Sequence, residues 1–303
     1  MQLNEMIFSR LVESQPLAGL LAQYDGRSAV FYSHAAPANS AQWGDVQYPR
    51  IDYTLDFQHD PARETGARLI VNIWCDAHFG AQPEAVESAL RQLFHASFAF
   101  ASDGAFALSW LRSDTFELPA SDAQFARTLG ITMHIDLAAC ECLALHSPDP
   151  VRGIGAWTKR TLPKAVVVGF DEMDGWYVPL PDAPVIVWRL SSTALAQRRN
   201  VFSWLEVVLE GQVYAAGAQA RLTALSTLHT ALSHVHHVEL DDQSPLLITD
   251  CAVKPHARLF APGQLTVKGR FGALAPGYEG AVEAAAVGGG EEDTGVFRPR
   301  AGS

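Results

Sequence analysis

The chain contains several short stretches in which apolar and polar residues alternate, which is the pattern of a half-buried β-strand. The clearest is 131–137, where the odd-numbered residues are apolar and the even-numbered ones are Thr132, His134 and Asp136. Weaker alternation or β-branched runs mark further strands at 29–33, 50–57, 68–74 and 105–112. The pattern therefore predicts a chain rich in β-strands.

Apolar residues at helical spacing predict two helices in the same part of the chain. The first lies within 3–21, where Pro16 should end or kink it. The second is 83–94, which has Pro83 at a plausible first helical position and Leu90 on its apolar side. After the N-terminal helix, the predicted order is strand, strand, helix, strand, strand.

This order of elements recurs at an offset of about 135 residues. Four elements match in sequence: 49–55 with 184–190, 69–74 with 204–209, 83–94 with 216–232, and 130–137 with 265–271. In the first match, each segment begins with a proline and continues as a strand-like run that ends in leucine. Four matches in one order indicate an internal duplication.

We therefore expect an α+β fold of two tandem repeats, each a mostly antiparallel β-sheet with a helix packed on one face. The expected parts are an N-terminal helix at 1–23, repeat one at 24–142, a connector at 143–163, repeat two at 164–273 and a flexible C-terminal tail at 274–303. The connector is rich in Pro, Gly and basic residues. The tail contains Gly288–Gly290 and an acidic run, a composition that cannot form a core.

Composition indicates a globular protein. Of the 303 residues, 48% are hydrophobic and 18% are charged, so there is ample apolar side chain to bury a core. The formal net charge of -11 argues against a sequence-independent grip on nucleic acid phosphates, which needs a basic surface. We expect neither a cleaved secretion signal nor a membrane partner, since no window has the roughly 18 uninterrupted apolar residues of a membrane span.

Several polar clusters could carry chemistry, but each has a plainer interpretation. His229, His234, His236 and His237 lack a metal-ligand spacing such as H-E-x-x-H and lie where a helix should end and a strand begin. Cys75 follows an apolar strand, which favours a buried thiol over an active thiolate. The chain has no G-x-S-x-G elbow and no complete dinucleotide fingerprint. We therefore expect no catalytic residue, no cofactor and no metal site.

Large aromatic residues stand in corresponding loops of the two repeats. Trp43 and Tyr48 precede the first matched strand of repeat one, and Trp176 and Tyr177 precede that of repeat two. Trp and Tyr supply a large contact area with few rotatable bonds, so in loops flanked by Pro and Asp they favour contact surfaces. We assign these four residues to an interface; the alternative is that they fold back on the sheet as lids.

Four segments of repeat one resemble the tail-terminator, or tail-completion, family of tailed bacteriophages: Tyr48–Tyr53, Ala67–Cys75, Pro83–Val86 and Leu108–Phe116. In that family a proline, a strand, a variable loop, a strand, a helix beginning near Pro-Glu and a strand pair form a small α+β subunit. The resemblance implies a non-enzymatic structural protein whose copies form a ring that caps the tail tube and joins it to the head connector. In repeat two, only the order and type of the elements resemble the family.

The resemblance also implies the partners and the place of work. The partners would be further copies of the chain, the tail tube protein and the head-tail connector protein, in a virion tail assembled in the bacterial host cytoplasm. DNA would pass through the lumen without specific binding, which the net acidity fits. The chain departs from the family in being duplicated, so the ring could be a trimer acting as a pseudo-hexamer or a hexamer with twelve positions.

The residues alone also allow a second class of function. Duplicated α+β units could form a cytosolic enzyme or a ligand-binding protein with a site between them. The His229–His237 cluster would then be the natural candidate. Rings or stacked tubes in negative-stain images would favour the structural protein, whereas a compact monomer with bound metal would favour this alternative.

Overall fold

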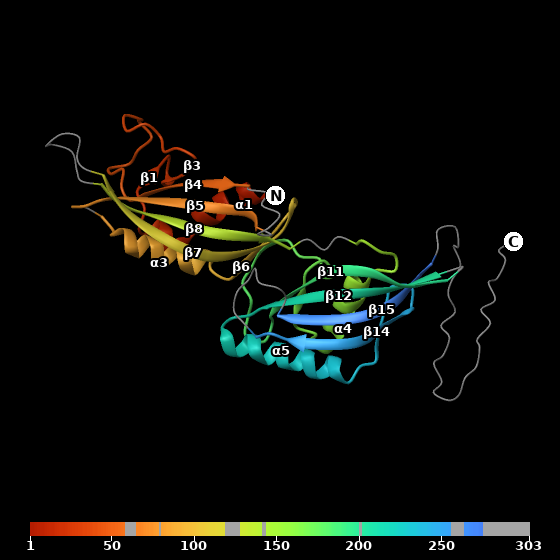
Figure 1. The fold of residues 1–303 in the computed structure, drawn as a ribbon. Helices are drawn as coiled ribbons and strands as arrows, with labels where there is room; N and C mark the ends of the chain where they lie inside the picture. The colour runs from red at the N-terminus through yellow and green to blue at the C-terminus, as the bar shows by residue number, and fades with distance from the viewer. Residues whose placement is uncertain are drawn as a thin grey trace. The chain divides into compact units, whose positions relative to one another are not determined.

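The computed structural model describes residues 1–57, 65–78, 80–118, 128–140, 144–199, 202–255 and 264–274. The chain divides into two compact units, each with one large sheet and packed helices (Figure 1). The first unit holds Met1–Glu141 together with the short segment Glu172–Leu180. The second unit holds Cys142–Asp171 and most of the residues from Pro181 onward. The expected α+β class is confirmed.

The first unit is built on a seven-stranded sheet in the order β10-β6-β7-β8-β5-β4-β3. Its strands are β3 (Val30–Tyr32), β4 (Arg50–Asp56), β5 (Thr65–Asp76), β6 (Ser97–Ala101), β7 (Gly104–Leu118), β8 (Thr128–Ala139) and β10 (Gly175–Tyr177). All neighbours are antiparallel except β3 and β4, which are parallel. Two further strands, β1 (Gln23–Tyr24) and β2 (Arg27–Ser28), form a small hairpin.

Three helices bury their apolar sides in the core of the first unit: α1 (Leu3–Val12), α2 (Gln15–Ala18) and α3 (Pro83–Phe94). Helix α3 begins at the predicted proline and buries Leu90 completely. Helix α1 ends before Pro16, which lies in the first turn of α2, so the chain breaks where the proline predicted. The apolar residues of β8 also enter this core, as their alternation indicated.

The second unit has a six-stranded sheet in the order β13-β14-β15-β12-β11-β9. Its strands are β9 (Val166–Val167), β11 (Val185–Arg198), β12 (Phe202–Tyr214), β13 (His237–Glu239), β14 (Pro245–Val253) and β15 (Leu265–Leu274). Strand β9 is parallel to β11, and the other neighbours are antiparallel. Its helices are α4 (Pro150–Thr161) and α5 (Ala218–Ser233).

The two units share one plan, as the duplicated sequence pattern predicted. The strands β6-β7-β8-β5-β4-β3 of the first sheet correspond to β13-β14-β15-β12-β11-β9 of the second, and α1 and α3 correspond to α4 and α5. The two units also share individual side-chain hydrogen bonds between a strand and the first helix. Tyr53 of β4 donates from Oη to Asn4 Oδ1 of α1 at 3.0 Å. Trp188, in the matching place on β11, donates from Nε1 to Thr158 Oγ1 of α4 at 2.9 Å.

The matched residues do not keep one constant offset, which corrects part of the expected alignment. Ile51 pairs across strands with Ile73, and in the second unit Ile186 pairs with Val213. The sequence offset between equivalent residues of the two units is therefore larger for the strand pair β5 and β12 than for the pair β4 and β11. The segment 69–74 consequently does not align with 204–209 residue by residue, because β11 has 14 residues and β4 has 7, so the second hairpin extends farther before it turns.

Residues 143–163 are not a plain connector, because they contain helix α4. The side chain of Asp149 caps the start of this helix, and Ile154 is fully buried in the second core. The glycines that indicated a loop allow close packing: a Cβ atom on Gly153 would lie 2.6 Å from Leu240 Cδ2. The second repeat therefore begins with α4, and its counterpart α1 belongs to the first repeat rather than to a separate N-terminal part.

The predicted flexible tail and the expected lack of a membrane span can be compared with the structure only over the described residues. Of the predicted flexible tail at 274–303, only Leu274 lies among the described residues, at the end of β15. Within the described ranges, no helix is both long and apolar enough to cross a bilayer.

Candidate functional site

The aromatic residues predicted to form an interface lie in two separate places of the first unit. Trp43 and Tyr48 lie in the loop 33–49 between β3 and β4, whereas Trp176 and Tyr177 lie in β10. Strands β3 and β10 are at opposite ends of the strand order, so the structure does not bring the two pairs together. All four side chains are half-buried.

Strand β10 joins the first sheet although its residues lie in sequence between two strands of the second sheet. It pairs with β6, where Trp176 is opposite Ala99. The Trp176 ring centre lies 5.8 Å from that of Phe94 and 4.6 Å from the guanidinium carbon of Arg10. The expectation that Trp176 lies in a loop is therefore wrong, because the residue is part of a sheet edge and packs on its own chain.

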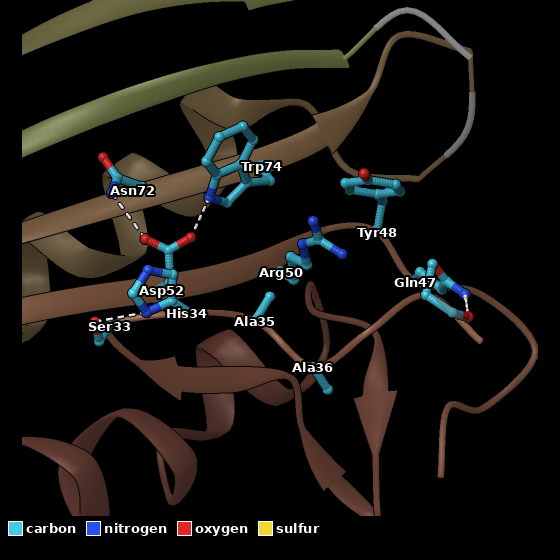
Figure 2. Close-up of a pocket in the computed structure, with 11 residues that line it drawn as sticks. Ser33, His34, Ala35, Ala36, Gln47, Tyr48, Arg50, Asp52, Asn72 and Trp74 are labelled. Carbon is cyan, nitrogen blue, oxygen red and sulfur yellow. Dashed lines mark hydrogen bonds between the residues drawn. The ribbon is translucent and has the colours of Figure 1, made fainter. Parts of the chain in front are cut away.

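A pocket of about 460 Å³ lies where the loop 33–49 meets strands β4 and β5 (Figure 2). The Asp52 carboxylate points into it, and the residue as a whole is only 7% exposed. Its two oxygens accept hydrogen bonds from Asn72 Nδ2 at 2.7 Å and from Trp74 Nε1 at 2.5 Å. Both carboxylate oxygens are thus held by neutral donors, so Asp52 fixes the orientation of its neighbours on β5.

The cationic group of this pocket is Arg50, on the same face of β4 as Asp52. Its guanidinium carbon lies 4.7 Å from the centre of the Tyr48 ring and 5.9 Å from that of Trp43. Arg50 Nε is buried and has no hydrogen-bond partner among the described residues. A guanidinium beside aromatic faces suits recognition of a carboxylate or another planar acceptor. The pocket therefore has the character of a contact site.

Comparisons with known protein families, with curated proteins and with solved structures found no match.

The pocket also holds a serine and a histidine in contact, Ser33 and His34, with 2.8 Å between Oγ and Nδ1. The two residues are neighbours in the chain, and the contact is exposed to solvent. An activated serine needs a base that is itself oriented and shielded from water. The arrangement lacks that shielding, so it gives no ground for proposing a nucleophile.

The histidine cluster is spread over a helix end and a strand, as its sequence position indicated. His229 is half-buried on α5, and His234, His236 and His237 are exposed. In the part of the chain that the structure describes, no three His, Cys, Asp or Glu side chains are grouped so that they could hold a metal ion. The pocket described above contains none of the four histidines.

The buried thiol expected at Cys75 is confirmed, since the residue is fully buried in the first core. Burial raises the pKa of the Cys75 thiol to about 12, and Glu84 adds to this rise. A thiol in this state is not a nucleophile at neutral pH.

Sequence reasoning missed Arg50, Asp52 and Asn72 as residues that meet in one pocket. A signal was present: strands β4 and β5 carry polar residues in mid-strand, where a fully buried strand would not. The register was needed to place them together, because Asp52 is directly opposite Asn72 across the two strands.

Proposed function

We propose that the chain is a non-enzymatic structural protein that forms a ring at the end of a phage or phage-like tail, where it terminates the tail tube and joins it to the head connector. The observation that carries this proposal is the duplicated unit in which a loop of the second repeat supplies strand β10 to the sheet of the first. A chain with that construction already exchanges one strand between its two repeats.

A repeated head-to-tail link closes into a ring when the rotation per unit divides the circle. With two units per chain, three chains form a pseudo-hexamer, and six chains form a ring of twelve positions. The partners of such a ring are further copies of the chain, the tail tube protein and the head-tail connector protein. The place of work is a virion tail assembled in the host cytoplasm.

Charge and site chemistry agree with this role. The formal net charge of -11 suits a lumen through which DNA slides without being held. The pocket at Arg50 offers a cation and aromatic faces but no shielded nucleophile. The family resemblance of the segments Tyr48–Tyr53 and Ala67–Cys75 points to the same class of protein.

The test is the assembly state of the full chain. Sedimentation velocity over a range of concentrations should show a discrete oligomer, and negative-stain images should show rings with six or twelve positions. Mixed with purified tail tubes, the protein should bind at tube ends. A chain that stays monomeric at every concentration and leaves tube ends bare would refute the proposal.

A further inference from the structure

The two sheets differ at one equivalent edge. In the first sheet the outer edge of β6 is covered by β10, whereas among the described residues no strand pairs with the outer edge of β13, its counterpart. An open sheet edge presents unpaired backbone groups and is a template for pairing with another chain. We infer that the outer edge of β13 binds a second copy of this chain, which adds a segment of its loop 33–49 as a further strand. The inference rests on the proposed ring, because it names the edge through which chains join.

The equivalence of β6 and β13 is detailed. Each is followed by a hairpin whose turn contains an aspartate that accepts from the backbone at the start of the repeat's first helix. Leu3 N–H donates to Asp103 Oδ1 at 3.2 Å, and Asp149 N–H donates to Asp241 Oδ1 at 3.3 Å. A strand that fits on one edge therefore has a matching place on the other.

The backbone groups of β13 that point outward can be identified. The carbonyl of His236 accepts from Ile248 N–H at 2.9 Å. Leu240 N–H donates to the carbonyl of Ser244, the residue just before β14, at 2.9 Å. Backbone groups alternate along a strand, so those of His237 and Glu239 point away from β14. Both side chains are exposed. Helix α4 lies beside the strand, since a Cβ atom on Gly153 would be 3.2 Å from Glu239 O, and α1 lies beside β6 in the same way without preventing the pairing of β10.

The occupant follows from the duplication. The loop that supplies β10 is 168–184, between β9 and β11, and its counterpart is 33–49, between β3 and β4, which has the same length. Each loop contains one tryptophan, Trp176 or Trp43, and each ends in a proline before the matched strand. The segment around Trp43 is thus the equivalent donor, and it must serve a sheet of another chain if the same link is to be repeated around a ring.

The segment around Trp43 uses only one of its two edges for β1. Gln42 O accepts from Asp25 N–H at 2.9 Å, and Gly44 N–H donates to Gln23 O at 3.0 Å. These bonds use one edge of the segment for β1, and the backbone of Trp43 points to the other edge. There Trp43 N–H donates to Ser40 O at 3.5 Å, a long turn contact that pairing with another strand would replace. Beyond it, Val46 is 55% exposed. The loop can therefore stay on β1 and pair antiparallel with β13 of a second copy, with Trp43 opposite His237 as Trp176 is opposite Ala99.

The first test is disulfide cross-linking between differently labelled chains. One variant carries Ala41→Cys and the other Glu239→Cys, which face each other when Trp43 is opposite His237 in an antiparallel pairing, both in a background of Cys142→Ser and Cys251→Ser. Neighbouring strands hold Cβ atoms about 4.5–5.5 Å apart, close enough for a disulfide after small adjustments. Mixing should give a covalent heterodimer under mild oxidation. The matched control replaces Glu239→Cys with Ser226→Cys, which is exposed on α5 and should not cross-link.

The second test removes one outward donor. Glu239→Pro deletes a backbone N–H that faces away from β14, so it should weaken chain-to-chain association about tenfold while the melting curve stays close to that of the wild type. Rings that persist in Glu239→Pro, without a specific cross-link, would overturn the β13 assignment and leave the ring proposal standing. A wild type that forms neither rings nor the cross-link would overturn both. If Glu239→Pro fails to fold, the cross-link alone decides.

Discussion

Asp52 shows how a single polar side chain organises part of a sheet face. Its carboxylate accepts from Asn72 and Trp74, and Asn72 Oδ1 in turn accepts from Thr132 Oγ1 at 2.8 Å. The four residues come from three adjacent strands, so the network ties β4, β5 and β8 together on the face away from the apolar core.

Asp52→Ala should lower the free energy of unfolding by about 1–3 kcal/mol, because two partly buried donors lose their acceptor. Urea unfolding followed by circular dichroism measures the change. Asp45→Ala removes an exposed carboxylate from the same part of the chain and is the matched control, expected to change stability by less than about 0.5 kcal/mol. Equal effects of the two substitutions would show that the network does not stabilise the fold.

His134 makes stability depend on pH. Burial, and then the nearby Arg112 and Arg68, lower the pKa of His134, although Asp114 acts in the opposite direction. In the unfolded chain the pKa returns to about 6.5. As the pH falls below that value, the unfolded state takes up more protons at this site than the folded state, and stability is lost.

His134→Gln should therefore lose less stability than the wild type as the pH falls from about 7 to about 5. The measurement is the free energy of unfolding in urea at several pH values. His95→Gln, in which the replaced ring is exposed, should follow the wild-type curve. A steeper loss in His134→Gln than in the wild type would contradict the assigned direction.

At the scale of the element, the helices are anchored by one apolar side each. Leu90 of α3 and Leu225 of α5 are almost completely buried in the first and the second core. Placing a charge at either position buries it without a partner.

Leu90→Asp and Leu225→Asp should each unfold the unit that contains the residue, with a loss of more than about 4 kcal/mol. Limited proteolysis should then cleave that unit faster than the other. Ser88→Asp and Ser226→Asp place the same charge on exposed positions of the same helices and should leave both units resistant. Resistant Leu90→Asp protein would mean that this side of α3 is not core.

The elements predictable from sequence are those whose pattern is set by one sheet face or one helix side. The alternation in 131–137 and the apolar stripe of 83–94 each correspond to a buried side, and the duplication follows from their order. Helix α4 was missed because Gly153 and Gly155 look like a loop when their packing partners are unknown. The pocket was missed because Arg50 and Asn72 meet only through strand register.

At the scale of the whole molecule, the position of β10 changes what Trp176 is expected to do. Its ring packs on Phe94 and Arg10 within the first unit. Trp176→Ala should lower the melting temperature of that unit, with a loss of about 1–3 kcal/mol for a half-buried aromatic residue. Differential scanning calorimetry measures it, and Trp43→Ala is the comparison. A Trp176→Ala protein that melts like the wild type would show that β10 is not held by this residue.

Strand β10 also has a consequence for synthesis on the ribosome. The first sheet has its last strand only when Tyr177 has emerged, after α4 and β9 of the following repeat have been made. Until then the nascent first repeat exposes the edge of β6, including backbone that will later pair with β10. A polypeptide released at residue 141 would keep that edge open permanently, so we expect it to be recovered in aggregates.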